Sequence, residues 1–386
     1  MDVLLIGSSY SAVPMLFDLK RRGATITVVG KYEDDPCHSY ADASVYIDYS
    51  DPEALLNVCK KHDFAGIVPS CNDYAYVSAA KVAAQLGYPG FDNLETTKIL
   101  HEKDHFRHFC TSMDLPAPKL FGEVSDSRRV LAGKIDCPAL VKPVDSFSGR
   151  GVERVLDSVA LPAAIDRALE QSRGSRAVVE EFVEGNLHSH TAFIADKEIV
   201  WHEIVDEFCE VYSYQVDKSA YPSRLSDELR ASVHESLSVL VSKLDLADGL
   251  LHTQFIASPE RFWIIECMRR CPGDLFGSHF HFAEGRDYTH EYVSSFIGMP
   301  PKAPEATKPL RRVERRVVSV EDVQPMFGVT FETDGRPATF IPLKESVQKL
   351  AAAPFDKAGI LFLEGRLDED PWEPFQASGS GIAKHE

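Results

Sequence analysis

The sequence lacks long hydrophobic runs and is poor in positive charge. No apolar stretch approaches the about 18 residues that a membrane-crossing helix requires, and the opening MDVLLIGSSY has neither a basic region nor a cleavage site. We therefore expect a cytoplasmic protein without a membrane partner. Lys and Arg number 41 against 59 Asp and Glu, a formal net charge of −18. Such a surface repels nucleic acid, so an anionic ligand needs a local cluster of donors.

Paired cysteines are also missing. The eight cysteines contain no CxxC pair, which argues against a zinc knuckle and predicts reduced thiols. HSH at 188–190 and HFH at 279–281 would each place two imidazoles on one face of a strand. No third ligand follows at a fitting spacing, so we expect no dedicated zinc site.

The first 96 residues alternate short apolar strands with helices. DVLLIG is a strand, a helix follows and ends at Gly23, and ATITVVG is a second strand. The pattern predicts a small doubly wound, Rossmann-like α/β sheet. A dinucleotide fingerprint is incomplete here, because Tyr10 and Ala12 occupy positions where glycine would admit a pyrophosphate.

Strands and helices are mixed without strict alternation in the rest of the chain, which favours α+β architecture. We expect a polar helix over 96–118 and helices over 158–173 and 226–244, and a proline-rich linker at 298–309. The predicted domains are 1–96, 97–300 with subdomains at about 97–177 and 178–300, a small C-terminal α+β domain at 301–375, and a flexible tail at 376–386.

Two apolar segments, LLHTQFIA and RFWIIECM, are joined by SPE and predict a hairpin. A register symmetric about Glu260 places Gln254 opposite Glu266, with Cβ atoms about 5 Å apart, so that an amide oxygen and a carboxylate can share a hard cation. Alternation puts Glu266, Met268 and Arg270 on one face. The alternative is a simple cross-strand pair beside a solvated arginine.

The segment ALVKPVDSFSGRGV places Lys142 on an apolar strand and follows it with a serine- and glycine-containing loop. Ser146, Ser148, Gly149 and Gly151 can fold backbone N–H groups around phosphate oxygens. A glycine-containing hairpin would explain the same residues.

The segment AVVEEFVEG runs from an apolar strand into Glu180 and Glu181. The backbone of such a strand can bind a purine while its side chains pack on the ring faces. An edge strand that carries charges against aggregation is the alternative.

Taken in order, EKDHFRHFC, ALVKPVDSFSGRGV, VVEEFVEG and the HTQFIA–WIIECMRRCPGD hairpin resemble the ATP-grasp superfamily of carboxylate–amine ligases. That superfamily includes amino acid and dipeptide ligases and the carbamoyl phosphate synthase large chain. The resemblance covers residues 1 to about 300 and implies a pre-ATP-grasp domain followed by the ATP-grasp fold, with ATP and Mg²⁺ or Mn²⁺ as cofactors.

The resemblance implies a role for each matching position. The nucleotide contacts it implies are Lys103 and Lys142, the loop from Ser146 to Gly151 with Ser148 and Gly149, Glu180 with the backbone of Glu181 and Val183 for adenine, and Glu184 or His188 for ribose. The metal ligands and catalytic groups it implies are Gln254 and Glu266 for magnesium, and Arg270 and Lys142 for the transferring phosphoryl group.

The chain departs from the family pattern at two positions. Met268 stands where an asparagine usually helps to hold a second magnesium, and a thioether is a poor ligand for that hard ion. Asp274 is a candidate replacement. Leu187 stands near the usual ribose-binding glutamate, which leaves that contact to Glu184 or His188.

These features predict an ATP-dependent ligase that converts a carboxylate to an acyl phosphate and then forms an amide with an amine. Its partners would be small-molecule carboxylates and amines, with amino acids among the candidates, and a homodimer is one option for its assembly. A carboxylase-type enzyme that activates bicarbonate, or a nucleotide-binding regulatory protein without turnover, are the alternatives. The loop at 145–151 would act as a lid against hydrolysis of the acyl phosphate.

Overall fold

The computed structural model of the chain describes residues 1–125, 135–146, 149–331, 333, 335–353 and 355–368. The chain forms two compact units: unit 1 contains Met1–Glu203, Leu225–Cys271 and Thr289–Ala303, and unit 2 contains Ile204–Arg224, Pro272–Tyr288 and the chain from Pro304 onward. The predicted boundaries near 96, 300 and 375 stay predictions, and the predicted tail at 376–386 lies outside the described residues.

Unit 1 begins with a parallel sheet in the order β3-β2-β1-β4. Its elements are β1 Asp2–Ile6, 3₁₀ helix η1 Tyr10–Ala12, α1 Val13–Arg21, β2 Thr25–Val29, η2 Pro36–Tyr40, β3 Ala43–Val45, α2 Pro52–Cys59, β4 Gly66–Pro69 and α3 Asp73–Leu86. Local signals set the helix ends, since the Asn72 side chain caps α3 and Gly87 ends it with a φ of +80°. The predicted Rossmann-like start of the chain is present.

The predicted helix over 96–118 is in fact two helices, α4 Leu94–His101 and α5 Lys103–Ser112. Glu102 is extended, with φ −111° and ψ 120°, and serves as the end of one helix and the start of the next. The helical side-chain period continues across this residue, which is why the sequence pattern hid the break. The break makes Lys103 the first residue of α5.

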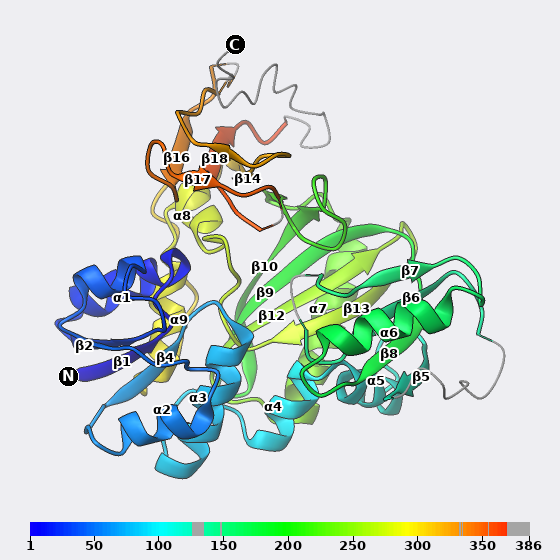
Figure 1. The fold of residues 1–386 in the computed structure, drawn as a ribbon, viewed down its shortest axis with the longest axis horizontal. Helices are drawn as coiled ribbons and strands as arrows, with labels where there is room; N and C mark the ends of the chain where they lie inside the picture. Colours follow the sequence, from blue (N-terminus) through cyan, green and yellow to red (C-terminus); the bar gives the residue numbers. More distant parts are fainter. Residues whose placement is uncertain (126–134, 147–148, 332, 334, 354, 369–386) are drawn as a thin grey trace. The chain divides into compact units, whose positions relative to one another are not determined.

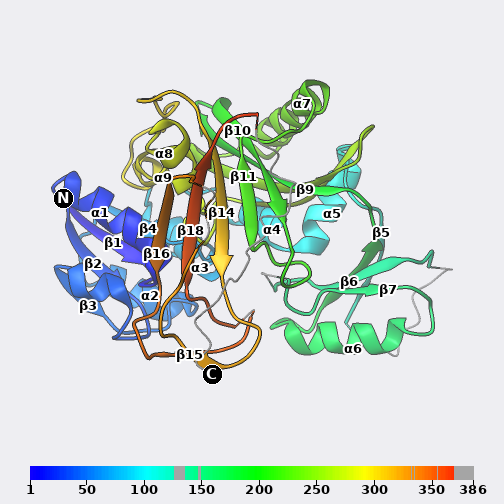
Figure 2. The same ribbon diagram turned by 90° about the horizontal axis from the view of Figure 1, so that it is seen from above.

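A four-stranded antiparallel sheet in the order β5-β8-β6-β7 follows. It comprises β5 Leu120–Val124, β6 Ala139–Pro143, β7 Glu153–Val155 and β8 Ala177–Glu181, with α6 Leu161–Gln171 between β7 and β8 in the chain. Helix α6 covers one face of this sheet (Figures 1 and 2). Its buried residues, among them Ile165 and Ala168, pack on Val141 and Val179.

The remaining elements of unit 1 form a second antiparallel group: β9 Asn186–Ala195, the part of β10 Glu198–Phe208 up to Glu203, α7 Asp227–Leu244, β12 Gly249–Ala257, β13 Phe262–Met268 and most of α9 Tyr288–Phe296. The strand order is β13-β12-β9-β10. Figure 1 shows these strands running side by side. Leu251, Thr253 and Phe255 lie on one face of β12 and are all 0% exposed, whereas Gln254 and Ile256 on the other face are only partly buried.

Unit 2 contains the rest of β10 and the strands β11 Lys218–Tyr221, β14 Arg312–Val318, β15 Gln324–Pro325, β16 Ala338–Pro342, β17 Lys349–Leu350 and β18 Gly359–Gly365, with helix α8 Ser278–Glu284. Strands β14, β18 and β16 run side by side (Figure 2). The HFH motif lies in α8, so its predicted strand is wrong. His279 is buried and His281 is exposed, and the two rings do not share a strand face.

Among the helices of the described chain, none combines the length and the hydropathy that a bilayer crossing requires.

Candidate active site

The hairpin of β12 and β13 has the predicted register at its functional end. His252 pairs with Met268, Thr253 with Cys267 and Gln254 with Glu266, and a bulge after Gln254 shifts the pairing beyond it. The opposition of Gln254 and Glu266 is therefore confirmed. Both residues are only partly buried, so a carboxamide and a carboxylate lie side by side with access to solvent.

A pocket of about 430 Å³ adjoins this strand in unit 1. Its lining includes four of the predicted site residues, Lys103, Ser146, Glu266 and Arg270, together with Met268. Segments far apart in the chain thus meet at one cavity. Among the described residues, Lys142, Glu180 and Gln254 are not part of that lining.

Arg270 is held at the pocket by Asp73, the first residue of α3. The Nη2 group of Arg270 donates to the Asp73 carboxylate over 2.7 Å, and His101 Nδ1 lies 3.4 Å from the same carboxylate. Burial by itself would raise the pKa of Asp73, but Arg270 and His101 hold it below its ordinary value. The ion pair fixes the guanidinium while Nε remains without a partner among the described groups.

A buried triad of charges lies on β6, β8 and α5. Glu180 is 0% exposed, accepts a 2.9 Å hydrogen bond from Nε of Arg107 and forms an ion pair with Lys142. Arg107 is 1% exposed and also donates to the Ile265 carbonyl over 2.7 Å, which ties α5 to β13. With two cations and one anion, the triad carries a net charge of +1 inside the protein.

Burial lowers the pKa of Lys142, and the nearby cations Arg107 and Lys103 lower it further, against the attraction of Glu180. Lys103 contributes to the lowered pKa of Lys142 by charge repulsion, so the two lysines that we expect to contact ATP lie near each other. Burial tends to raise the pKa of Glu180, yet Arg107 and Lys142 hold it below its ordinary value, so the carboxylate stays ionised.

The loop after β6 approaches Lys103, whose Nζ donates to the Ser146 carbonyl over 2.5 Å. Ser146 Oγ donates in turn to the Arg150 carbonyl over 3.2 Å. Ser148 lies outside the described residues. The loop is thus tied to the start of α5 by the lysine that we expect to contact ATP.

Two glycines in this loop adopt left-handed backbone angles, with φ of +69° at Gly149 and +70° at Gly151. A Cβ added at Gly151 would lie 2.8 Å from Cγ of Pro143 and 2.9 Å from Cβ of Gln171. Both the angle and the space at Gly151 therefore require glycine. The backbone can fold closely over the end of β6 for that reason.

The predicted adenine strand ends at Glu181, whose N–H donates to the Lys119 carbonyl over 2.9 Å. Val183 is buried. Glu184 is exposed, with an oxygen 3.6 Å from Arg154. His188 is buried and stacks on Phe255 at a centroid distance of 5.3 Å.

The faces of the strands separate the two ribose candidates. His188 pairs with Phe255, and Ser189 pairs with Gln254, so alternation places His188 on the face opposite to Gln254. Glu184 precedes the strand and is not subject to that constraint. The ribose contact by either residue stays a prediction.

Sequence reasoning missed Arg107 and Asp73, the residues that hold Glu180 and Arg270. Arg107 lies one helical turn after Lys103 on α5. That spacing on a polar helix was an available signal, although the sequence alone does not show that the arginine is buried. Asp274, the candidate for a second metal, is committed within unit 2 to an ion pair with Lys357.

The donor set fits magnesium. Carboxylate and carboxamide oxygens are the hard ligands that Mg²⁺ and Mn²⁺ prefer, and Gln254 and Glu266 present one of each at a paired position. Mg²⁺ keeps several waters and phosphate oxygens as ligands, so two protein ligands suffice.

Comparison with known proteins gave no matching family model. A formate-dependent phosphoribosylglycinamide formyltransferase of Sulfurovum sp. (strain NBC37-1) is 30% identical over 315 residues, 77% of this chain and 76% of that protein. The enzyme of the same name from Rhodococcus jostii (strain RHA1) is 28% identical over 246 residues, and the match spans only 60% of its length.

The crystal structure of phosphoribosylglycinamide synthetase from Anaerococcus prevotii superimposes with a TM-score of 0.76 and 16% sequence identity, over 95% of this chain and 94% of that one. At such identity the likeness concerns the fold. It confirms the predicted fold class, a Rossmann-like sheet followed by α+β architecture.

Proposed function

Because this chain belongs with the formate-dependent phosphoribosylglycinamide formyltransferases in the ATP-grasp superfamily, we propose that it activates a carboxylate with ATP and transfers the acyl group to an amine. The resemblance inferred from the motifs is thereby confirmed. So are the predictions of an ATP-dependent enzyme of the class that forms carbon–nitrogen bonds, and of ATP with Mg²⁺ as cofactors.

The observation that supports this proposal is that Lys103 and Arg270 meet Glu266 at one pocket, in a chain of net charge −18. Lys81 and Lys98 add two further ammonium groups to the lining, beside the carboxylates of Asp73, Glu102 and Asp145. A pocket with Lys103 and Arg270 beside the Glu266 carboxylate, which pairs with Gln254 on the next strand, suits an anionic substrate next to a metal-bound triphosphate.

The reaction needs positioning and charge neutralisation more than covalent help. A carboxylate oxygen of the substrate attacks the γ-phosphorus, the bond from that phosphorus to the bridging oxygen breaks, and ADP leaves with the electron pair. The amine nitrogen then attacks the carbonyl carbon of the acyl phosphate, phosphate leaves, and the nitrogen loses a proton to give the amide.

The chain's own residues would divide this work. Lys103 and Lys142 neutralise the phosphate oxygens, and Arg270, fixed by Asp73, stabilises the phosphoryl group in transfer. Mg²⁺ held by Gln254 and Glu266 would supply further neutralisation of the triphosphate. The loop from Ser146 to Gly151 would cover the phosphates and keep water from the acyl phosphate.

The relatives are named for formate, so we propose a carboxylate of similar small size as the first substrate to test, with phosphoribosylglycinamide and amino acids as amines. Because the matched segment spans 60% of the Rhodococcus protein, the pairing of carboxylate and amine is open to experiment. Phosphate release should be measured across carboxylate–amine pairs with the full chain, with and without Mg²⁺, beside a Glu266→Gln variant.

We expect phosphate release that requires both a carboxylate and an amine and that falls in the variant. Hydrolysis stimulated by bicarbonate alone would instead favour the carboxylase-type alternative. Tight ATP binding without ADP release across the whole panel would favour the regulatory alternative. That alternative rests on Met268, a poor magnesium ligand that lines the pocket. Either of these results would refute the ligase proposal.

A further inference from the structure

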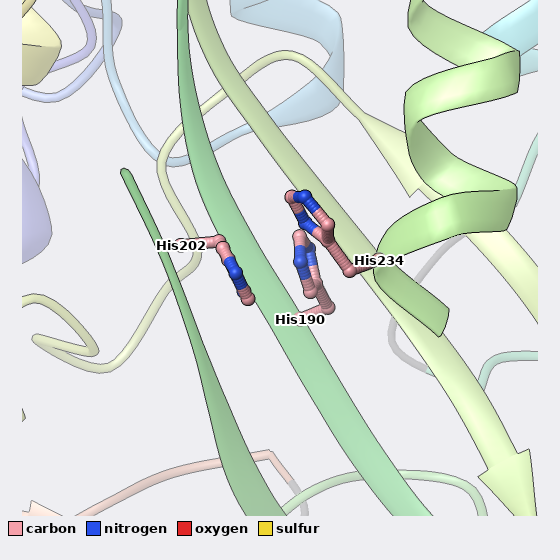
Figure 3. A group of neighbouring side chains, drawn as sticks. All are labelled: His190, His202 and His234. Carbon is pink, nitrogen blue, oxygen red and sulfur yellow. The ribbon is translucent and has the colours of Figure 1, made fainter. Parts of the chain in front are cut away.

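Three histidines from separate elements of unit 1 meet away from the proposed ATP site. They are His190 on β9, His202 on β10 and His234 on α7 (Figure 3). One ring nitrogen of each lies within 4.8 Å of the others. The HSH motif has no third ligand at a fitting spacing in the sequence, and the fold brings His202 from the next strand and His234 from α7 to His190.

The nitrogens of these rings lack partners within the described chain. Both nitrogens of His190, which is 0% exposed, and Nδ1 of His202 and of His234 are buried and accept or donate no hydrogen bond there. A neutral imidazole has one donor and one acceptor nitrogen, and each one left unmatched in the interior costs about 1–3 kcal/mol. A buried ring with two unmatched nitrogens therefore indicates a missing ligand.

The strand register separates this cluster from the predicted magnesium ligands. His190 pairs with Thr253, and Ser189 pairs with Gln254. Successive side chains point to opposite faces, so His190 and Gln254 lie on opposite faces of the sheet. The cluster is a site of its own and not a part of the phosphate-binding pocket.

We propose that His190, His202 and His234 bind a transition-metal ion of the Zn²⁺ class, with a water molecule as the fourth ligand. Neutral imidazole is a ligand that zinc prefers, and three histidines with an open fourth position form a known zinc geometry. Mg²⁺ prefers oxygen ligands and would not compete with Zn²⁺ for these imidazole nitrogens. The ion would join β9, β10 and α7 by direct bonds.

The charges around the cluster favour the neutral, ligating form. Burial, and then the neighbouring histidines, keep the pKa of His190 well below its ordinary value, and burial with His234 and Arg230 lowers the pKa of His202 to about 4. Metal binding at neutral pH then displaces no proton from these two rings. The positive charge of Arg230 disfavours a metal cation beside it. A hydroxide bound to that cation as the fourth ligand would offset part of the repulsion.

The resting geometry requires a modest rearrangement. The rings of His190 and His202 are stacked with centroids 5.0 Å apart, and those of His202 and His234 with centroids 4.2 Å apart. Tetrahedral ligands at about 2.1 Å from zinc are separated by about 3.4 Å, so nitrogens now within 4.8 Å of one another must close by up to about 1.4 Å. Ring rotation about χ2, a soft torsion, provides this movement.

The test uses the full chain, stripped with EDTA, dialysed and titrated with Zn²⁺ against a chromophoric chelator. We expect one tightly bound Zn²⁺ per chain that saturating Mg²⁺ does not displace. Co²⁺ in its place should give the visible bands of a tetrahedral nitrogen and oxygen site without a thiolate charge-transfer band, which distinguishes this cluster from the free cysteines.

His190→Gln, His202→Gln and His234→Gln should each weaken binding by at least about 100-fold, because loss of outer-shell partners alone weakens metal sites 10- to 100-fold. His62→Gln, at an exposed histidine of the same unit, is the control and should bind as the parent does. His234 is only partly buried on its helix, so its variant should fold, as circular dichroism in EDTA will verify, even where the His190 variant does not.

Absence of stoichiometric binding, binding that survives His202→Gln and His234→Gln, or a thiolate band in the cobalt form would overturn the proposal. In that case the three rings form a neutral packing cluster and nothing more.

Discussion

The buried triad of Lys142, Glu180 and Arg107 allows stability to be separated from catalysis. Glu180→Gln keeps the shape of the side chain but leaves two cations facing one another in the interior. Glu180 and Arg107 are 0% and 1% exposed, so solvent cannot screen the unpaired charges. Loss of one partner of a buried ion pair costs about 3–5 kcal/mol, a large part of the total stability of most domains.

Lys142→Met should behave in the opposite way. It leaves the 2.9 Å contact of Arg107 with Glu180 intact and removes an ammonium group whose pKa burial already lowers. The substitution leaves no uncompensated charge buried, because Arg107 still balances Glu180, and an uncompensated charge is what makes the loss of one partner costly. We therefore expect an unfolding free energy within about 1 kcal/mol of the parent, together with loss of phosphoryl transfer.

A double-mutant cycle gives the decisive measurement. Glu180→Gln should cost about 1–3 kcal/mol less when residue 142 is already methionine, because only Arg107 is then left unpaired. Urea unfolding followed by circular dichroism supplies the free energies, and phosphate release supplies the activity. Effects that add within about 0.5 kcal/mol, or a Lys142→Met variant as unstable as Glu180→Gln, would refute the electrostatic coupling.

Four further outcomes are expected. Glu266→Gln should raise the Mg²⁺ concentration for half-maximal ATP turnover by about tenfold or more, and an unchanged requirement would remove Glu266 from the metal site. Asp73→Asn frees Arg270 and should lower kcat by about 10²-fold, as loss of a positioned donor does, while circular dichroism stays unchanged; an unaltered kcat would argue against this anchor. Gly151→Ala should cost about 1–2 kcal/mol for its left-handed angle alone, and stability equal to the parent's in urea would mean that the loop accommodates the methyl group. Burial with His234 and Arg230 lowers the pKa of folded His202 to about 4, against 6.5 for the free side chain, so stability should fall as the pH drops from 6.5 to 4, by less than the about 3 kcal/mol of a fully buried group because the ring is only partly buried, and His202→Gln should flatten that slope in metal-free protein.

The sequence allowed the pairing of β12 with β13 to be predicted because the signal is local. Four residues, 258–261, join the two strands, and so short a loop sets the register next to the turn. The turn pairs Phe255 with Ile264, a register that would set Gln254 opposite Ile265, and the bulge between Gln254 and Phe255 shifts the pairing so that Gln254 lies opposite Glu266. The bulge after Gln254 depends on packing in the sheet, and it lay beyond the reach of the pattern.

The break at Glu102 was not predictable in the same way. Residues on both sides of it have helical propensity, and no Gly or Pro marks the stop between 94 and 112. Long-range ion pairs with Arg176 hold the junction, since that guanidinium contacts both Glu102 and Asp104. A contact across more than 70 positions of sequence leaves no local trace.

Burial explains why the anchoring residues escaped the sequence reasoning while the residues they anchor did not. Lys103 and Arg270 stand in motifs whose order along the chain carries information. Arg107 and Asp73 are ordinary charged residues on helices, and the one-turn spacing of Arg107 from Lys103 does not show whether that face is buried or solvated. Their function arises because the fold removes them from water, and an ionised group that loses water must find a partner. In this chain those partners are Glu180 and Arg270, so the residues that the motifs omit determine the geometry of the residues that the motifs include.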